Sequence, residues 1–188
     1  MRFIKWHLGI IGIALFGIAA RSEAFEIKLK QEKIAEVAEY SKKYKGKEIF
    51  ASPVVKSACF GKYPEGEGGL IMSKYVKTAI ISAMMAINDK ILTKDDIKKI
   101  EESTSFDVVV TVPGEYAEAL EDVQIMLKQG TNNILPLKTA FGMKRKDTLR
   151  TLVATFQYEK VNPKASTAVI VRTRKVQKKY TIDFSDVK

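Results

Sequence analysis

The feature that most constrains the fold of this chain is a long apolar stretch at residues 73–92. In its middle, residues 79–87, Ser82 is the only polar residue. A surface helix normally keeps one face polar throughout, whereas here Ile81 and Met85 fall inside the polar stripe. We therefore expect a central core helix that is covered on nearly all sides. The rest of its polar stripe, expected to face outward, is Lys74, Lys77, Thr78, Ser82, Asn88 and Asp89.

Ile81 and Met85 are accordingly candidates for a pocket or a partner-binding surface. We favour the interpretation that the chain's own residues cover both side chains. The alternative is that a ligand or a partner protein binds to them.

The N-terminal segment, residues 1–24, has the order of a secretory signal peptide. Arg2 and Lys5 precede an apolar run of thirteen residues, 8–20, and a small-x-small cleavage site precedes Phe25. The run is short for a membrane span, which needs about 20 residues. We expect cleavage and a periplasmic or secreted protein. The alternative is an inner-membrane protein anchored through residues 8–20.

Removing residues 1–24 leaves 164 residues with 29 basic and 21 acidic side chains, a net charge of +8. That length suits one domain, residues 25–188. The single cysteine, Cys59, cannot form an intramolecular disulfide, so the core must hold the fold. We expect Cys59 to be a small buried hydrophobe. The alternative is an exposed thiol that pairs with a second chain.

Hydrophobic periodicity predicts further helices at residues 31–45, 93–103 and 115–129. A capping box formed by Thr93 and Asp96 begins the second of these helices. Residues 61–69 are glycine-rich and predict a mobile loop before the central helix. Their spacing matches neither common phosphate-binding motif, so we do not expect nucleotide binding.

Alternating patterns predict several strands. Residues 48–57 form an irregular strand interrupted by Pro53, and residues 106–112 form an interior strand with apolar residues on both faces. Residues 151–160, 167–174 and 179–184 predict a C-terminal three-stranded antiparallel meander. The fold class expected is α+β: a single domain with helices packed on one face of a mostly antiparallel sheet.

The absence of histidine after the signal segment excludes several chemistries. The only histidine is His7, so the mature chain has neither a Ser-His-Asp nor a Cys-His catalytic group. One cysteine and no histidine do not make a usual zinc site, and we expect no metal and no cofactor. Carboxylate chemistry, or a Ser-Lys or Tyr-Lys arrangement, remains. Glu65, Glu67 and Asp107 are candidate acids of a glycan hydrolase.

A second candidate site is a cationic patch formed by two basic groups. Solvated strand ends are the ordinary explanation, and the alternative is binding of an anionic envelope polymer or lipid surface. Nucleic-acid binding is not expected, because no aromatic residue is interleaved in residues 144–150. The candidate residues are Lys144, Arg145, Lys146, Arg150, Arg172 and Arg174.

These observations predict an exported, non-catalytic binding protein of the cell envelope. Its partner would be an envelope protein, an apolar ligand or an anionic envelope surface. One alternative is a carboxylate-dependent hydrolase of envelope glycan, which needs two carboxyl groups facing each other across a polar cleft. Another is a structural subunit of an envelope complex, which predicts an exposed apolar patch instead of a cavity.

Overall fold

Strand β3 (Ser105–Pro113) is the middle strand of a five-stranded antiparallel sheet in the computed structural model, which describes residues 29–143 and 148–187. The predicted interior position is confirmed, because Val108, Val109 and Val110 are all buried. The predicted signal peptide lies outside the described residues. The strand order is β1-β2-β3-β7-β6, with β1 at Cys59–Gly61, β2 at Gly68–Met72, β6 at Lys138–Phe141 and β7 at Leu149–Gln157.

A second antiparallel sheet contains the other four strands. The predicted C-terminal three-stranded meander is wrong, because its first strand belongs to the other sheet. β7 pairs with β3, with Phe156 opposite Phe106, so only β8 and β9 of the three C-terminal strands are neighbours. The short connections between the C-terminal segments indicate that neighbours in sequence pair with each other. Strand β7 instead lies between β6 and β3, and β3 comes from far earlier in the chain. The order is β5-β4-β8-β9, with β4 at Val123–Gln129, β5 at Asn132–Ile134, β8 at Thr167–Thr173 and β9 at Gln177–Ile182.

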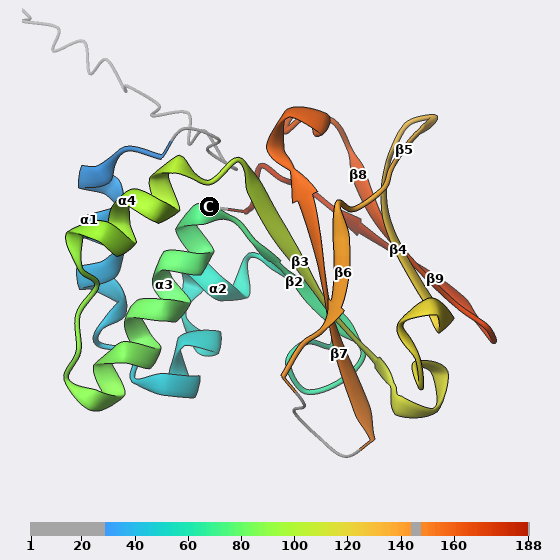
Figure 1. Ribbon diagram of the computed structural model, residues 1–188, viewed down its shortest axis with the longest axis horizontal. Helices are drawn as coiled ribbons and strands as arrows, with labels where there is room; N and C mark the ends of the chain where they lie inside the picture. Colours follow the sequence, from blue (N-terminus) through green and yellow to red (C-terminus); the bar gives the residue numbers. More distant parts are fainter. Residues whose placement is uncertain (1–28, 144–147, 188) are drawn as a thin grey trace, which may run out of the picture.

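The helices lie together on one side of the sheets, nearest to β2 and β3 (Figure 1). The α+β fold class is therefore confirmed. The α-helices are α1 at Gln31–Ser41, α2 at Pro53–Lys56, α3 at Lys74–Met85 and α4 at Lys94–Glu102. The 3-10 turns are η1 at Gly46–Ala51, η2 at Ala86–Asn88, η3 at Gly114–Tyr116, η4 at Leu120–Asp122 and η5 at Tyr158–Lys160.

Helix α3 is central, as predicted, because it packs against α1, α2, α4 and β2. Its buried side, however, includes three residues of the stripe expected to face outward, Lys74, Thr78 and Ser82. The small residues Ala79, Ser82 and Ala83 are buried, and they allow the neighbouring helices to approach closely. Thr78 is also fully buried and donates a hydrogen bond to its own helix at the Lys74 oxygen, at 2.7 Å. Side-chain size, more than polarity, decides which side of α3 faces the other helices.

The opposite side of α3 is less covered than expected. Ile81 and Met85 are only half-buried, and Met84 is 39% exposed. Ile87, in the following 3-10 turn, is 56% exposed. The prediction that the chain covers this helix on nearly all sides is therefore wrong for its C-terminal half.

Two other segments differ from their predicted elements. Residues 48–57 form η1 and α2 instead of a strand, because Pro53 occupies the first turn of α2 and the Ser52 hydroxyl accepts a hydrogen bond from the Val55 N–H. Residues 115–129 form 3-10 turns and strand β4 instead of a helix. Val123, Ile125 and Leu127 alternate along β4 and are buried.

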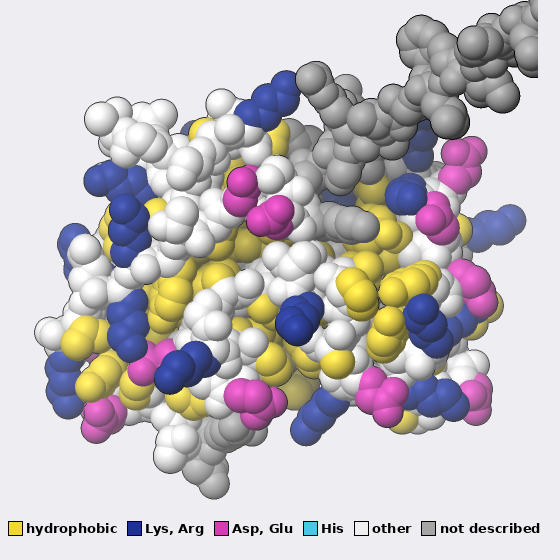
Figure 2. All heavy atoms as spheres, turned by 180° about the vertical axis from the view of Figure 1, so that it is seen from behind, with side chains coloured by type: hydrophobic (Ala, Val, Ile, Leu, Met, Phe, Trp, Pro, Cys, Tyr) yellow, Lys and Arg dark blue, Asp and Glu magenta, His cyan; other side chains and the backbone are white. Residues whose placement is uncertain are grey.

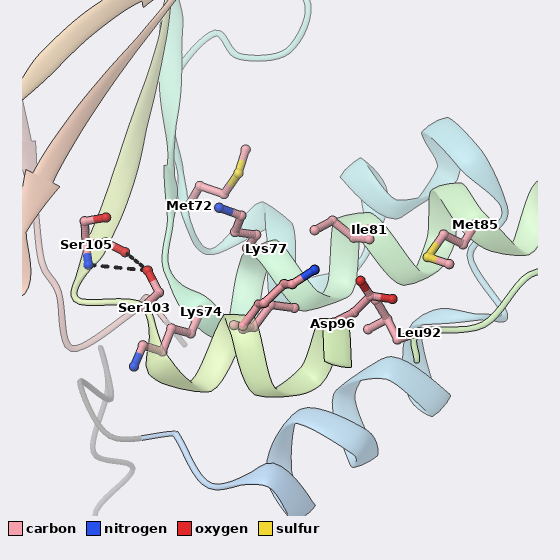
Figure 3. Close-up of a pocket in the computed structure, with 11 residues that line it drawn as sticks. Met72, Lys74, Lys77, Ile81, Met85, Leu92, Asp96, Ser103 and Ser105 are labelled. Carbon is pink, nitrogen blue, oxygen red and sulfur yellow. Dashed lines mark hydrogen bonds between the residues drawn. The ribbon is translucent and has the colours of Figure 1, made fainter. Parts of the chain in front are cut away.

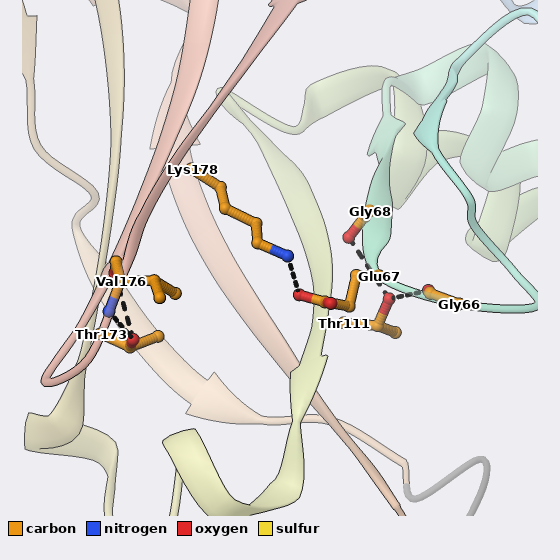
Figure 4. A network of polar contacts seen from close by, with 7 residues as sticks. All are labelled: Gly66, Glu67, Gly68, Thr111, Thr173, Val176 and Lys178. Atoms are coloured by element: carbon orange, nitrogen blue, oxygen red, sulfur yellow. Dashed lines mark hydrogen bonds and ion pairs between the residues drawn. The ribbon is translucent and has the colours of Figure 1, made fainter.

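The glycine-rich segment is a tight turn between β1 and β2 instead of a mobile loop. The Lys62 N–H donates to the main-chain oxygen of Glu67 at 2.7 Å. Gly69 is required by close strand approach, since a Cβ there would lie 2.2 Å from the Val109 oxygen. The side-chain carboxylate of Glu67 accepts a hydrogen bond from the Lys178 ammonium of β9 at 2.5 Å, which connects the turn to the second sheet (Figure 4).

Opposite faces of β3 contact different layers. Asp107 forms an ion pair with Lys77 of α3 at 3.7 Å. Its neighbour Phe106 has ring contacts with Phe156 and with Phe184, which follows β9. Because successive side chains of a strand point to opposite faces, β3 has α3 on one side and the C-terminal segment on the other.

Cys59 is half-buried at the start of β1, where its thiol donates to the Val55 oxygen at 3.2 Å. This environment is less enclosed than the buried position expected from the sequence. The alternative of pairing with a second chain stays a prediction.

Candidate ligand-binding pocket

A pocket of about 340 Å³ lies between α3 and α4, and we call it the α3/α4 pocket. Figure 3 shows the side chains that form it, contributed by β2, α3, α4, the segment between the two helices, and the end of α4 with the start of β3. Both residues singled out in the sequence, Ile81 and Met85, line it. The eleven lining residues are Met72, Lys74, Lys77, Ile81, Met85, Leu92, Asp96, Lys99, Ile100, Ser103 and Ser105.

Five of the lining side chains are apolar: Met72, Ile81, Met85, Leu92 and Ile100. Ile100 is 7% exposed and packs in a small core that also contains Leu29 and Ile34. Leu92 packs against the same core. The α4 side of the pocket is therefore held by α1, and an apolar ligand would meet a fixed surface there.

Lys77 places an ammonium group on the α3 wall. Its Nζ lies 3.7 Å from Asp107 Oδ2, and its side chain is 43% exposed. The other oxygen of Asp107 accepts a hydrogen bond from the Thr155 hydroxyl at 2.7 Å. Lys77 thus has a counterion behind it, while its distance from that carboxylate is long for a hydrogen bond.

Asp96 is the only carboxylate of the lining, and the predicted capping box engages it. Its Oδ2 accepts from the Thr93 N–H at 3.0 Å and from the Thr93 hydroxyl at 2.7 Å. These hydrogen bonds lower the pKa of Asp96, and the nearby charge of Lys99 contributes in the same direction. An ionised carboxylate held in this way is poorly suited to proton transfer at neutral pH.

Lys74 is turned toward the end of α4. Its Nζ donates to the Glu101 main-chain oxygen at 2.6 Å and lies 5.5 Å from the centre of the Tyr158 ring. Burial lowers the pKa of Lys74, against a smaller opposing effect of Glu101. The Lys74 N–H also donates to the Tyr158 hydroxyl at 3.0 Å. Lys74 therefore connects the start of α3 to the end of α4 through its ammonium group, and to Tyr158, which follows β7, through its main-chain N–H.

The pKa of Tyr158 is raised, mainly by burial of the phenol. Its hydroxyl accepts the Lys74 N–H, and this hydrogen bond only partly opposes that effect. A buried phenol with a raised pKa stays protonated. A Tyr-Lys nucleophilic arrangement is not favoured here.

Lys99 supplies the third ammonium of the lining. It is exposed on α4 and forms no hydrogen bond or ion pair with any residue that the structure describes. All three of its N–H donors are consequently available to a ligand.

A second hollow, of about 430 Å³, lies on the other side of Lys74 and is more polar. It contains three carboxylates, Glu101, Glu102 and Glu159. Glu101 accepts a hydrogen bond from Gln31 at 2.6 Å, and Glu102 lies 3.8 Å from Lys98. Two of the three carboxylates thus have partners on the helices.

Two of the candidate acids predicted from the sequence, Glu67 and Asp107, do not come together. Asp107 lies opposite Met72, whereas Glu67 immediately precedes Gly68, which lies opposite Thr111. The five-residue offset along the sheet corresponds to roughly 16 Å. Paired glycosidase carboxylates are about 5–9.5 Å apart, so Glu67 and Asp107 cannot act as such a pair.

The candidate cationic residues are divided between the two sheets. Arg150 lies in β7, and Arg172 and Arg174 lie in β8 or directly after it. Arg172 donates to the Gln177 side chain at 2.9 Å, and Arg174 lies 2.5 Å from Asp122. The remaining candidates, Lys144, Arg145 and Lys146, lie outside the described residues.

The charge on the face seen in Figure 2 is mixed. Basic and acidic side chains alternate over both the helices and the sheets, with apolar side chains between them. Among the described residues, no three His, Cys, Asp or Glu side chains are grouped so as to hold a metal ion.

Sequence reasoning did not include Lys77 and Lys99 in the site. A signal for them exists, since Lys77, Ile81 and Met85 follow one another at four-residue spacing and share one face of α3. Asp96, Lys99 and Ser103 follow the corresponding pattern on α4. What the sequence does not show is that these two faces meet.

The chain was compared with protein-family models, with curated proteins and with solved structures, and none of them matches it. In the described part of the chain, no helix combines the length and the apolar character needed to cross a membrane.

Proposed function

We propose that this protein is an exported, non-catalytic binding protein of the cell envelope, and that its ligand occupies the α3/α4 pocket. The observation that carries the proposal is the apolar wall formed by Ile81, Met85 and Leu92 beside the ammonium groups of Lys77 and Lys99. Small-molecule sites are commonly mostly apolar, with a few convergent polar groups.

A binding role is favoured over catalysis by what the pocket contains. It has no histidine and no cysteine, and its one carboxylate, Asp96, is engaged by Thr93. Nucleophilic and general-base mechanisms both need an activated group within reach of the substrate.

Binding is tested with a small neutral fluorophore whose emission rises in apolar surroundings, such as 1-aminonaphthalene. Met85→Gln places an amide in the apolar wall and is expected to weaken probe binding. Met84→Gln is the matched control, because Met84 is adjacent, 39% exposed and not part of the lining. Equal probe affinity in both variants would contradict a site in the α3/α4 pocket.

Export is tested separately, because it rests on the sequence of residues 1–24. Mass spectrometry of the protein recovered from the periplasm or medium is expected to give an N-terminus at Phe25. Recovery of Met1 in a membrane fraction would instead favour the anchored alternative.

The glycan hydrolase remains the second candidate, because the hollow beside Lys74 contains Glu101, Glu102 and Glu159. It predicts release of soluble fragments from purified envelope glycan. Loss of that release in Glu159→Gln, with retention in Glu118→Gln, would favour it over the binding function.

A further inference from the structure

We infer that the α3/α4 pocket binds an amphipathic monoanion, an apolar chain of medium length that ends in one carboxylate. This inference rests on the proposed function and deepens it by naming the chemical class of the ligand. It follows from the donors, the charge and the dimensions of the pocket.

The lining of the pocket has more charged hydrogen-bond donors than charged acceptors, with three lysines and one carboxylate. Asp96 Oδ2 accepts two hydrogen bonds from Thr93, whereas Lys99 forms no hydrogen bond or ion pair with any described residue and acts on Asp96 only through its charge. Lys77 is held only by the 3.7 Å contact with Asp107. A ligand carboxylate would accept a charge-assisted hydrogen bond from these lysines, while a ligand amine would meet three lysines and a single carboxylate.

The balance of charge favours one negative charge over two. The lining has three lysines and one aspartate. Asp107 stands behind Lys77, and Lys74 donates to the end of α4 beside Glu101. A phosphate dianion would need more uncompensated positive charge than Lys99 and Lys77 together provide.

The dimensions favour a chain of medium length. A volume of about 340 Å³ equals roughly eleven water molecules at about 30 Å³ each, which suits about a dozen non-hydrogen atoms. From Lys77 to Met85, the α3 wall extends about 12 Å. Lys77 and Met72 lie at one end of the pocket, and Met85 and Leu92 lie at the other (Figure 3). Figure 3 also shows Asp96 beside Leu92, so the carboxylate of a ligand would lie at the Lys77 end, away from Asp96, and its apolar chain would extend toward Met85.

The test compares decanoate with decanol as competitors of 1-aminonaphthalene on the purified full chain. The two compounds have the same chain, so their difference reports the carboxylate. We expect decanoate to compete roughly tenfold more strongly than decanol, since a charge-assisted hydrogen bond contributes about that much. We expect added salt to reduce only the decanoate affinity.

Two pairs of substitutions locate the effect. Lys77→Gln with Lys99→Gln is expected to remove the preference for decanoate and to leave decanol unchanged. Lys90→Gln with Lys94→Gln changes the charge equally on exposed residues outside the lining and is expected to keep the preference. Melting curves of both double variants verify that each is folded.

The outcomes separate the inference from the function on which it rests. If decanol and decanoate compete equally, the pocket binds apolar ligands and the anion inference is wrong. If only octyl phosphate competes strongly, the ligand is a dianion and the inference is also wrong. If the probe does not bind in any variant, the proposed function fails as well.

Discussion

The ammonium of Lys74, in the first turn of α3, donates a hydrogen bond to the main-chain oxygen of Glu101, in the last turn of α4, at 2.6 Å. The last carbonyl groups of a helix lack partners within the helix and carry partial negative charge. Lys74 is only 6% exposed. A lysine that appears to be a surface residue in the sequence therefore fixes α4 against α3.

Replacing Lys74 by methionine tests this role. The variant keeps most of the side-chain volume and loses the hydrogen bond, so we expect unfolding to require about 1.5–3 kcal/mol less free energy. Lys98→Met is the control, because Lys98 is exposed on α4, and it is expected to stay within about 0.5 kcal/mol of the wild type. Chemical denaturation measures both, and equal midpoints would contradict the role of Lys74.

A glutamate at Ala83 tests the small-residue side of α3. Ala83 is fully buried, and Ala83→Glu would bury a charge without a partner, at a cost of several kcal/mol. Met84→Glu changes the next residue, which is 39% exposed, and is expected to cost far less. Thermal unfolding distinguishes them. A wild-type melting temperature for Ala83→Glu would show that α3 does not pack as described.

The C-terminal segment contributes Phe184, whose ring meets Phe106 edge-to-face at 6.2 Å. Phe184 is fully buried, so Phe184→Ala is expected to cost about 3–5 kcal/mol. Phe141→Ala removes an aromatic ring that is 44% exposed and should cost well under half as much. Similar losses in the two variants would indicate that the segment after β9 does not close the core.

Local patterns predicted the elements whose signals were unambiguous. Strand β3 has apolar residues on both faces, and α4 begins with a capping box that the structure contains. Residues 123–127 are predicted to be helical because Val123 and Leu127 fit a helical stripe, whereas the structure has strand β4 there. Only the alternation of Val123, Ile125 and Leu127 separates the two interpretations, and it spans few residues.

Contacts between segments that are distant in the sequence could not be predicted from local patterns. The pairing of Phe156 with Phe106 depends on segments about fifty residues apart. Which side of α3 is buried depends on how closely the neighbouring helices pack against it. The pattern of polar and apolar residues alone does not predict that side. For the same reason Ile81 and Met85 were identified as candidates, whereas Lys99, which comes from another helix, was not.

Asp96→Asn tests the capping box through its pH dependence. The hydrogen bonds from Thr93 lower the pKa of the Asp96 carboxyl in the folded protein. A carboxyl with a lowered folded-state pKa stabilises the fold above its unfolded value, about 3.9, and loses this contribution as the pH falls through the folded-state value. Asp96→Asn should therefore be less stable than the wild type at pH 7, and the difference should shrink below about pH 4.

The control for this prediction is Asp95→Asn in the same turn of α4. It removes an equal charge near the helix N-terminus but leaves the Thr93–Asp96 hydrogen bonds in place. Urea denaturation at several pH values between 7 and 3.5 compares the three proteins. If the two variants lose the same stability at every pH, the charge of the first turn explains the effect and the capping box does not. A larger loss in Asp96→Asn that shrinks on acidification would show that the ionised carboxylate fixes the start of α4, and with it the wall of the pocket that contains Lys99.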